Sequence, residues 1–301
     1  MPVTAPVEAV RALAPVLGEP DGAPVALEGG ITNRNYRVRW GGRDCVLRCP
    51  GRDTALLGID RAAEWAATQA AAAAGVGPPG IAFDPGVGCL VTEWVEGRPI
   101  EPAELRGRIP ELAVALRTIH DGPALPAVFD VFAVVEAYRE IALARAASPP
   151  AGLDRLADGA AAIRAALRGP EHAPVPCHND LLASNVLDDG RRLWIVDWEY
   201  AGMGDRYFDL GNLAVNNDFG EDDELALLQA YRPDGGSARR VAALRLMRVM
   251  SDYREGMWGV VQSAVSELEF DFEGYAREHL ERAAAALEDP RLAGWLEDAR
   301  G

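Results

Sequence analysis

The segment that decides the fold is "CHNDLLASNVLDDGRRLWIVDWEYAG", residues 177–202. It gathers four Asp, two Asn, one Glu and one His among apolar residues that are typical of strands. A buried carboxylate without a partner costs free energy, so acceptors in a core need a cation or hydrogen-bond donors. Either this segment is a long solvated hairpin, or its polar side chains converge on a cation.

The pattern predicts two short strands, "SNVLDD" and "LWIVDW", joined at Asp189-Gly190. If the hairpin folds back there, Asn185 and Asp197 lie close together at its open end. Their amide and carboxylate oxygens suit Mg²⁺, which keeps several waters and shares the phosphate oxygens of a substrate. Asp180, one loop earlier, can then accept a proton from an attacking hydroxyl. The segment therefore predicts a site where a metal ion and a substrate hydroxyl meet.

The order of these residues follows the logic of a kinase catalytic loop: His178, Asp180 as the base, Asn185 five positions on, and Asp197 after a hairpin. The stretch "HNDLLASNVL…IVDWEYAGMGDRYFDLGN" resembles the choline/ethanolamine kinase branch of the aminoglycoside-phosphotransferase-like superfamily, which has a protein-kinase-like fold. The resemblance covers nearly the whole chain. It implies a kinase that uses ATP and Mg²⁺ to phosphorylate the hydroxyl of a small cationic alcohol, choline first.

Three residues are expected to support the catalytic loop without taking part in the chemistry. We expect His178 to orient the loop, because Asp180 is better placed to take a proton. His120, in "LRTIHDG", is expected to end a helix and pack beneath the loop. In the kinase-like fold, Asp209 of "YFDLGN" would hold the loop by accepting backbone hydrogen bonds.

The resemblance also implies the nucleotide contacts. "LEGGITNRNYRV" resembles the turn that covers the nucleotide, although it lacks the Gly-x-Gly-x-x-Gly of protein kinases. "VLRCPG" resembles the third strand of the family and "VTEWVEGRPI" its hinge. Arg48 takes the place of the usual phosphate-contacting Lys and pairs with Glu64. The implied nucleotide-binding residues are Gly29, Gly30, Thr32, Asn33, Arg48, Glu64, Glu93 and Val95.

A predicted helix over residues 237–268 supplies the acceptor side. Beside its apolar stripe, one face carries Ser251, Glu255, Trp258 and Gln262. The resemblance places Trp258 and Tyr275 in an aromatic cage for a cation, and it would put an aromatic residue where Glu255 stands. A carboxylate there can hydrogen-bond a primary ammonium, which favours ethanolamine. The acceptor-site residues expected are Glu199, Tyr200, Glu255, Trp258 and Tyr275.

Other readings of the same residues stay open. The fold would also suit a phosphotransferase acting on an aminoglycoside or sugar, a thiamine kinase, or a non-catalytic relative that only binds a nucleotide. Trp258, taken alone, is also compatible with packing in the core. Arg48 and Glu64 are also compatible with an ordinary ion pair on the surface.

The chain divides into two lobes by its patterning. Residues 1–96 predict a helix at 6–17, five strands, and a helix from Asp60 to Gly75, which together form a nucleotide-binding lobe. Residues 97–301 predict long helices, interrupted by the catalytic segment, and form the lobe that carries the substrate site. The fold class expected is therefore α+β, a two-lobed protein-kinase-like fold with a small antiparallel-sheet lobe and a larger helical lobe.

Composition narrows the partners. The chain has 301 residues and a formal net charge of -16, which argues against nucleic-acid binding. All 30 basic residues are Arg, so any phosphate clamp must be built from Arg. The four Cys fit no zinc spacing, and no apolar run is long enough to cross a bilayer. Without a recognisable secretory segment, a cytoplasmic protein is expected, and the oligomeric state is left open.

Overall fold

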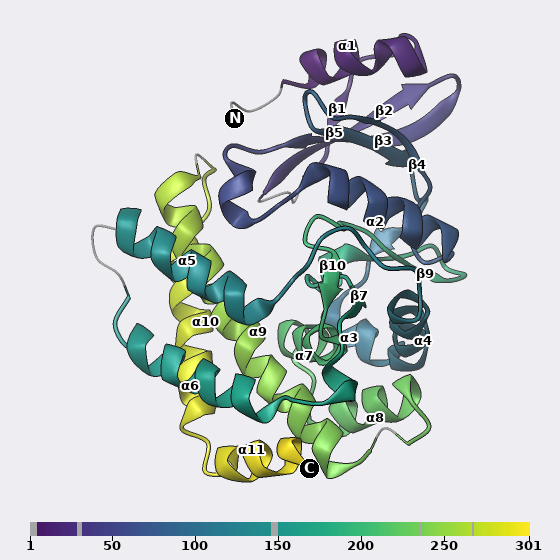
Figure 1. Cartoon of the computed structure of the whole chain (residues 1–301). Helices are drawn as coiled ribbons and strands as arrows, with labels where there is room; N and C mark the ends of the chain where they lie inside the picture. The colour runs from purple at the N-terminus through teal and green to yellow at the C-terminus, as the bar shows by residue number, and fades with distance from the viewer. Residues whose placement is uncertain (1–4, 29–31, 146–149, 235, 267) are drawn as a thin grey trace.

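A computed structural model describes residues 5–28, 32–145, 150–234, 236–266 and 268–301. Its upper part is an antiparallel sheet of five strands in the order β1-β2-β3-β5-β4 (Figure 1). The strands are β1 (Val25–Ala26), β2 (Asn33–Trp40), β3 (Arg43–Pro50), β4 (Gly80–Asp84) and β5 (Cys89–Glu93). Helix α1 (Pro6–Leu17) lies on the outer side of this sheet, and α2 (Arg61–Ala73) lies between the sheet and the helices below.

Local residue choices set the boundaries of these elements. Gly41 and Gly42 have φ of 54° and 77°, the left-handed values that a tight hairpin between β2 and β3 requires. The Asp60 side chain accepts hydrogen bonds from the first free amides of α2, at 2.9 and 3.1 Å. Gly75, with φ of 73°, follows the end of that helix. The predicted hairpin, helix start and helix stop are all confirmed.

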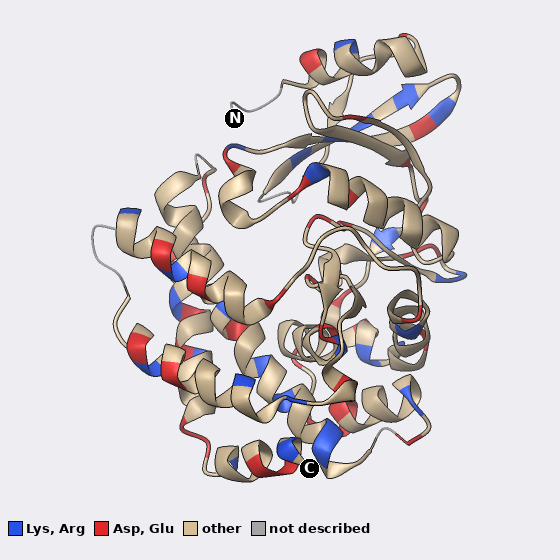
Figure 2. Ribbon diagram, viewed as in Figure 1, with Lys and Arg blue, Asp and Glu red and all other residues tan. Residues whose placement is uncertain are grey.

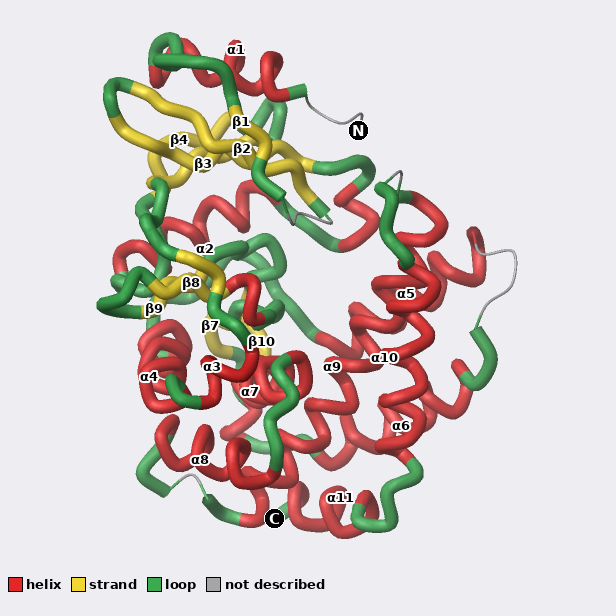
Figure 3. Tube along the Cα trace, turned by 180° about the vertical axis from the view of Figure 1, so that it is seen from behind, coloured by secondary structure: helices red, strands yellow, loops and turns green. Residues whose placement is uncertain are grey.

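The lower part is built from helices (Figures 1 and 3). They are α3 (Pro102–Arg106), α4 (Ile109–His120), α5 (Val131–Arg145), α6 (Leu153–Ala166), α7 (Arg206–Asn216), α8 (Glu221–Tyr231), α9 (Ala238–Val265), α10 (Phe272–Leu287) and α11 (Leu292–Arg300). Three short 3-10 turns occur at Thr54–Leu57, Pro170–His172 and Ala183–Asn185. Helix α9 is the axis of this part, because α5, α7, α10 and α11 all pack against it. Its middle is buried on nearly all sides, so both of its predicted faces are interior.

Short strands lie between the sheet and the helices (Figure 3). Strands β6 (Arg98–Pro99), β8 (Val186–Asp188) and β9 (Leu193–Ile195) form one small sheet, and β7 (Val175–Cys177) pairs with β10 (Gly202–Gly204). The predicted catalytic hairpin is therefore present, but its strands are shorter and its turn is wider than expected. The backbone turns over Asp189–Arg192, because the Asp189 side chain accepts hydrogen bonds from the amides of Arg191 and Arg192.

Two separate apolar cores support the two-lobed prediction. The smaller core joins α1 to the five-stranded sheet, and the larger one fills the helical part. Ala67 and Ala71 of α2 belong to the larger core, so this helix connects the two parts. The domain boundary after residue 96 stays a prediction.

Charged residues of both signs are distributed over the whole molecule. Acidic and basic residues are interspersed along the helices of the ribbon (Figure 2). Among the described residues, no helix combines the length and the hydropathy that a bilayer crossing needs. The four cysteines are buried and free of disulfides.

Candidate active site

Asp209 of α7 holds the catalytic loop in place. Its two carboxylate oxygens accept hydrogen bonds from the backbone amides of His178 and Asn179, at 2.8 and 2.7 Å. Asn179 has φ of 68°, a left-handed conformation that these bonds help to fix. The structure thus confirms that Asp209 ties the loop down through backbone amides.

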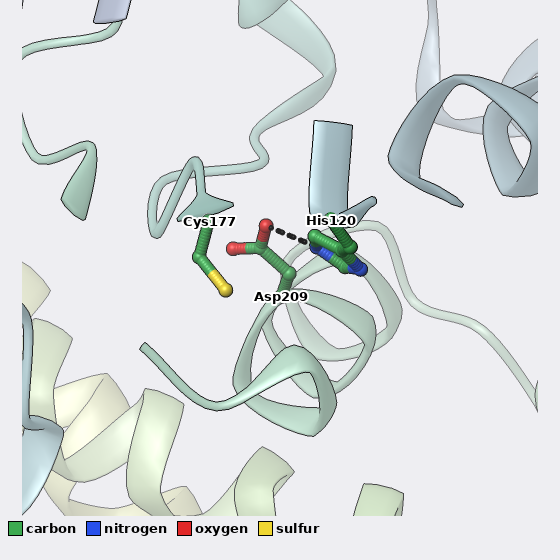
Figure 4. A group of neighbouring side chains, drawn as sticks. All are labelled: His120, Cys177 and Asp209. Atoms are coloured by element: carbon green, nitrogen blue, oxygen red, sulfur yellow. Dashed lines mark hydrogen bonds and ion pairs between the residues drawn. The ribbon is translucent and has the colours of Figure 1, made fainter. Parts of the chain in front are cut away.

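His120, Cys177 and Asp209 form a tight buried group (Figure 4). His120 bonds Asp209 through Nε2 at 3.0 Å and Tyr231 Oη through Nδ1 at 2.7 Å, so both of its ring nitrogens are occupied. Burial raises the pKa of the Cys177 thiol well above its usual value, which keeps it protonated. Because the His120 nitrogens and the Asp209 carboxylate already have hydrogen-bond partners, this group supports the loop and is not a metal site. The predicted position of His120 beneath the loop is confirmed.

His178 links the loop to the second strand of the hairpin. Its Nδ1 accepts from the amide of Asp180 at 3.1 Å, so its Nε2 carries the proton and donates to the Val196 carbonyl at 2.9 Å. Burial lowers the pKa of His178, which favours this neutral form. The ring orients Asp180 and takes no proton from a substrate, in agreement with the prediction.

Asp180, Asn185 and Asp197 line one cavity of about 290 Å³. The Asn185 amide donates to the Asp180 carbonyl at 2.9 Å and to its carboxylate at 3.3 Å. The Val196 amide bonds the Asn185 carbonyl at 3.0 Å, which brings Asp197 beside Asn185 as the hairpin prediction required. Asp197 has φ of 69°, a left-handed conformation that is uncommon for residues other than Gly.

This donor set fits the predicted Mg²⁺ ion. The Asn185 nitrogen is committed to Asp180, which leaves the amide oxygen as the ligand, and Asp197 supplies a carboxylate in the same cavity. Both are hard oxygen donors of the kind that Mg²⁺ prefers. Burial raises the pKa of Asp180 to about 8, while Arg254 opposes the shift and Glu255 adds to it. A divalent cation nearby would favour the ionised form of Asp180.

Arg48 on β3 makes the predicted pair with Glu64 on α2, at 2.8 Å. The same guanidinium nitrogen also forms an ion pair with Asp197. Arg48 is 9% exposed, so this is a buried bridge between the sheet and the catalytic segment. It is not a surface ion pair.

Arg61 completes a second bridge that the sequence did not reveal. Its guanidinium contacts Glu64 at 2.6 Å, Glu199 at 3.2 Å and the Asn33 oxygen at 2.7 Å. Asn33 in turn donates to Glu199 at 2.8 Å. Burial and the nearby Asp197 raise the pKa of Glu199 to about 7, against the effect of Arg61. The spacing of Arg61 and Glu64, three positions apart, was the local sign of this contact.

A second cavity, of about 310 Å³, lies between the sheet and the hinge. Its lining includes the predicted nucleotide residues Arg48, Glu64, Glu93 and Val95, with apolar walls from Val46, Leu90 and Leu187. The Glu93 backbone amide already donates to the Pro79 carbonyl at 2.9 Å, so of its two backbone groups only the carbonyl is left for an adenine. Thr32 and Asn33 line the other cavity, and Gly29 and Gly30 lie outside the described residues.

All five predicted acceptor-site residues line the cavity that holds Asp180: Glu199, Tyr200, Glu255, Trp258 and Tyr275. Trp258 Nε1 donates to Tyr200 Oη at 2.9 Å, and Tyr275 Oη donates to Glu255 at 2.9 Å. Their roles toward a substrate stay predictions.

Arg254 is a further member of this wall that sequence reasoning missed. It is 1% exposed and its Nη1 lies 3.2 Å from Asp180 and 2.5 Å from Glu255. In the sequence it is only one of several Arg on a long helix, so nothing local marked it as buried beside the catalytic loop.

Similarity to known proteins shows the family to which the chain belongs. The model of the phosphotransferase enzyme family matches residues 25–245, and the chain belongs to that family. Within it, a choline/ethanolamine kinase family protein from Mesorhizobium loti has a crystal structure that superposes with a TM-score of 0.82. The two chains are 32% identical, and the match covers 98% of each. The chain is therefore a member of the choline/ethanolamine kinase family and an ATP-dependent phosphotransferase.

More distant relatives are consistent with this. Mouse ethanolamine kinase 2 is 29% identical over 284 residues, which cover 82% of this chain and 71% of the mouse protein. LicA of Haemophilus influenzae is 24% identical, with 88% of this chain and 80% of LicA covered. The choline kinase LicA of Streptococcus pneumoniae shares the fold, with a TM-score of 0.79 at 24% identity over 92% of this chain and 96% of that one. The predicted family and fold class are thus confirmed.

Proposed function

We propose that this protein transfers the γ-phosphate of ATP, with Mg²⁺, to the hydroxyl of a small cationic amino alcohol of the choline and ethanolamine type. The observation that carries the proposal is the arrangement of the two cavities. Arg48 and Asp197 line both of them, whereas Asp180 lines only the acceptor side. An ATP molecule whose adenine lies in the hinge cavity would therefore place its phosphates beside Arg48 and Asp197, between the adenine and Asp180.

Each residue then has one task. Asp180 takes the proton of the acceptor hydroxyl as the hydroxyl oxygen attacks the γ-phosphorus, and the bond from that phosphorus to the bridging oxygen breaks to release ADP. Arg48 holds phosphate oxygens, as it is buried and already oriented by Glu64. Asn185 and Asp197 hold Mg²⁺, which supplies neutralising charge to the phosphates. Most of the rate enhancement comes from positioning and charge neutralisation, as phosphoryl transfer demands.

The acceptor class follows from the charge of the cavity. Its lining contains the carboxylates of Glu28, Asp180, Asp197, Glu199 and Glu255. It also contains the aromatic rings of Tyr200, Trp258 and Tyr275, and its cations among the described residues are Arg48 and Arg254. Excess carboxylate and aromatic faces favour a cationic ligand over a neutral sugar.

The test is ADP release from Mg-ATP with choline, ethanolamine, thiamine and kanamycin in parallel. Saturable stimulation by choline or ethanolamine, lost in D180N, supports the proposal. Stimulation by kanamycin or thiamine alone would assign the acceptor to another branch of the fold. Nucleotide binding without stimulation by any acceptor would indicate a non-catalytic relative.

A further inference from the structure

Helix α9 places a cation of the protein itself inside the acceptor-side cavity. The buried Arg254 guanidinium lies between Asp180 and Glu255, with its Nη1 3.2 and 2.5 Å from their carboxylates. Its Cζ also lies 4.2 Å from the ring centroid of Tyr200. Arg254 thus covers an aromatic face and neutralises a carboxylate, the two features that would otherwise attract a ligand cation.

Glu255 and Trp258, two further residues of the cavity lining, also have protein partners. Glu255 accepts from Arg254 through one oxygen and from Tyr275 Oη through the other, at 2.9 Å. The Trp258 ring packs edge-on against Tyr275 and Phe272, with centroids 5.6 and 5.8 Å away. The rings of Trp258 and Tyr200 therefore already have protein partners, which a bulky cation without N–H groups would have to share.

We propose that Arg254 is a specificity-determining residue that makes the site prefer a primary ammonium over a quaternary ammonium. This inference rests on the proposed function, an amino-alcohol kinase. A primary ammonium carries three N–H donors and can share the carboxylates of Asp180 and Glu255 with Arg254. A trimethylammonium cannot donate, so it depends on the ring faces and free charge that Arg254 has already taken.

The experiment compares four acceptors that differ only in N-methylation: ethanolamine, N-methylethanolamine, N,N-dimethylethanolamine and choline. The values of kcat and KM are measured at saturating Mg-ATP for the wild type, R254M and R254K. All four acceptors present the same hydroxyl to the same base. Any effect of losing Arg254 on proton transfer from that hydroxyl to Asp180 therefore cancels in the ratio of kcat/KM between acceptors.

For the wild type we expect kcat/KM to fall with each methyl group, by at least tenfold from ethanolamine to choline. R254M should reduce that ratio at least tenfold, chiefly through a lower KM for choline, since it frees Glu255 and the Tyr200 ring. R254K keeps a cation but loses the planar stacking, so its ratio should lie between the two. If R254M does not melt cooperatively, the ratio of kcat/KM for ethanolamine to that for choline in R254K tests the role of Arg254.

The matched control is R245M on the same helix. Arg245 pairs with Glu224 at 2.9 Å, outside the acceptor-side cavity, so its loss should leave the acceptor ratio unchanged. A wild type that prefers choline, or an unchanged ratio in R254M and R254K, overturns the role of Arg254. Absence of stimulation by all four acceptors in the wild type overturns the proposed function itself.

Discussion

Arg48 on β3 and Asp197 after β9 form an ion pair across 149 positions of sequence. This pair joins the five-stranded sheet to the catalytic segment, and Glu64 holds the same guanidinium from the other side. The nucleotide pocket and the acceptor-side cavity meet at these two residues.

Substituting Arg48 should weaken nucleotide use more than folding. In R48M we expect the KM for Mg-ATP to rise tenfold or more, because the described lining of the nucleotide cavity contains no other basic side chain. Glu64 keeps Arg61 as a partner at 2.6 Å, so the thermal midpoint should fall by only a few degrees. Titration with a non-hydrolysable ATP analogue measures the affinity, with R39M, an exposed Arg on β2, as the control. An unchanged affinity in R48M would exclude Arg48 from phosphate binding.

Removing the base should abolish turnover without removing the nucleotide. We expect D180N to lower kcat by about 10²–10⁴-fold, the usual contribution of general base catalysis. Its affinity for Mg-ATP should stay within about twofold, since Asp180 does not line the nucleotide cavity. D222N, at an exposed site on α8, is the control. Wild-type turnover by D180N would assign the proton transfer to another group.

The pH dependence of activity should follow Asp180. Its pKa is raised to about 8, so without metal most of the carboxyl is protonated at neutral pH. Because only the ionised form accepts a proton, kcat/KM for the acceptor should rise with pH along a single acid limb. Raising the Mg²⁺ concentration should move that limb to lower pH, because the cation favours the ionised form. A limb that does not respond to Mg²⁺ would belong to another group.

The same shift has a consequence for stability. A carboxyl whose pKa is higher in the folded state than in the unfolded state binds more protons when folded. Asp180 therefore lowers the free energy of unfolding as pH rises from about 4, its unfolded value, to about 8. Without metal, D180N should be more stable than the wild type at pH 8, and the difference should shrink at pH 5. Denaturant titration at the two pH values measures it, and a difference independent of pH would contradict the assignment.

Loss of Asp209 should both destabilise the fold and disorder the catalytic loop. D209A removes the acceptor for the amides of His178 and Asn179 and for His120 Nε2. Buried donors left without partners cost about 1–3 kcal/mol each, so we expect a loss of roughly 3 kcal/mol or more. D158A, at an exposed site on α6, is the control. A D209A variant with the wild-type midpoint would show that the loop is held by other contacts.

Two glycines offer a matched pair for the packing of α7 on α9. A Cβ at Gly211 would lie 2.8 Å from the Arg248 amide and 3.0 Å from the Leu244 carbonyl, so G211A should push these helices apart. We expect a loss of about 1–3 kcal/mol, together with lower kcat, because the neighbouring Asn212 bonds the amide of Leu181 at 2.5 Å. G294A in α11 meets no atom within 4 Å and should stabilise by about 0.5–1 kcal/mol. Equal effects of the two substitutions would contradict this account.

The sequence predicts those parts of the site whose residues lie close together along the chain. Asp180, Asn185 and Asp197 lie within one hairpin, and residue patterning fixes such local geometry. Asp60, Gly41 and Gly42 were readable because caps and tight turns depend on the residue itself. The wider hairpin turn was missed because the Asp189 side chain competes for backbone amides, which alternation of apolar residues does not report.

The sequence by itself determined the catalytic segment, the order of the elements and the acidic, lysine-free character of the chain. Only the tertiary structure decided that Arg61 joins Asn33 to Glu199, and that Arg254 turns toward Asp180 and Glu255. The physical reason is that a charged residue on a helix looks the same in sequence whether it faces water or a neighbouring carboxylate. The difference between these two states is whether the side chain is buried. The packing of α9 against the catalytic loop decides which of its side chains are buried.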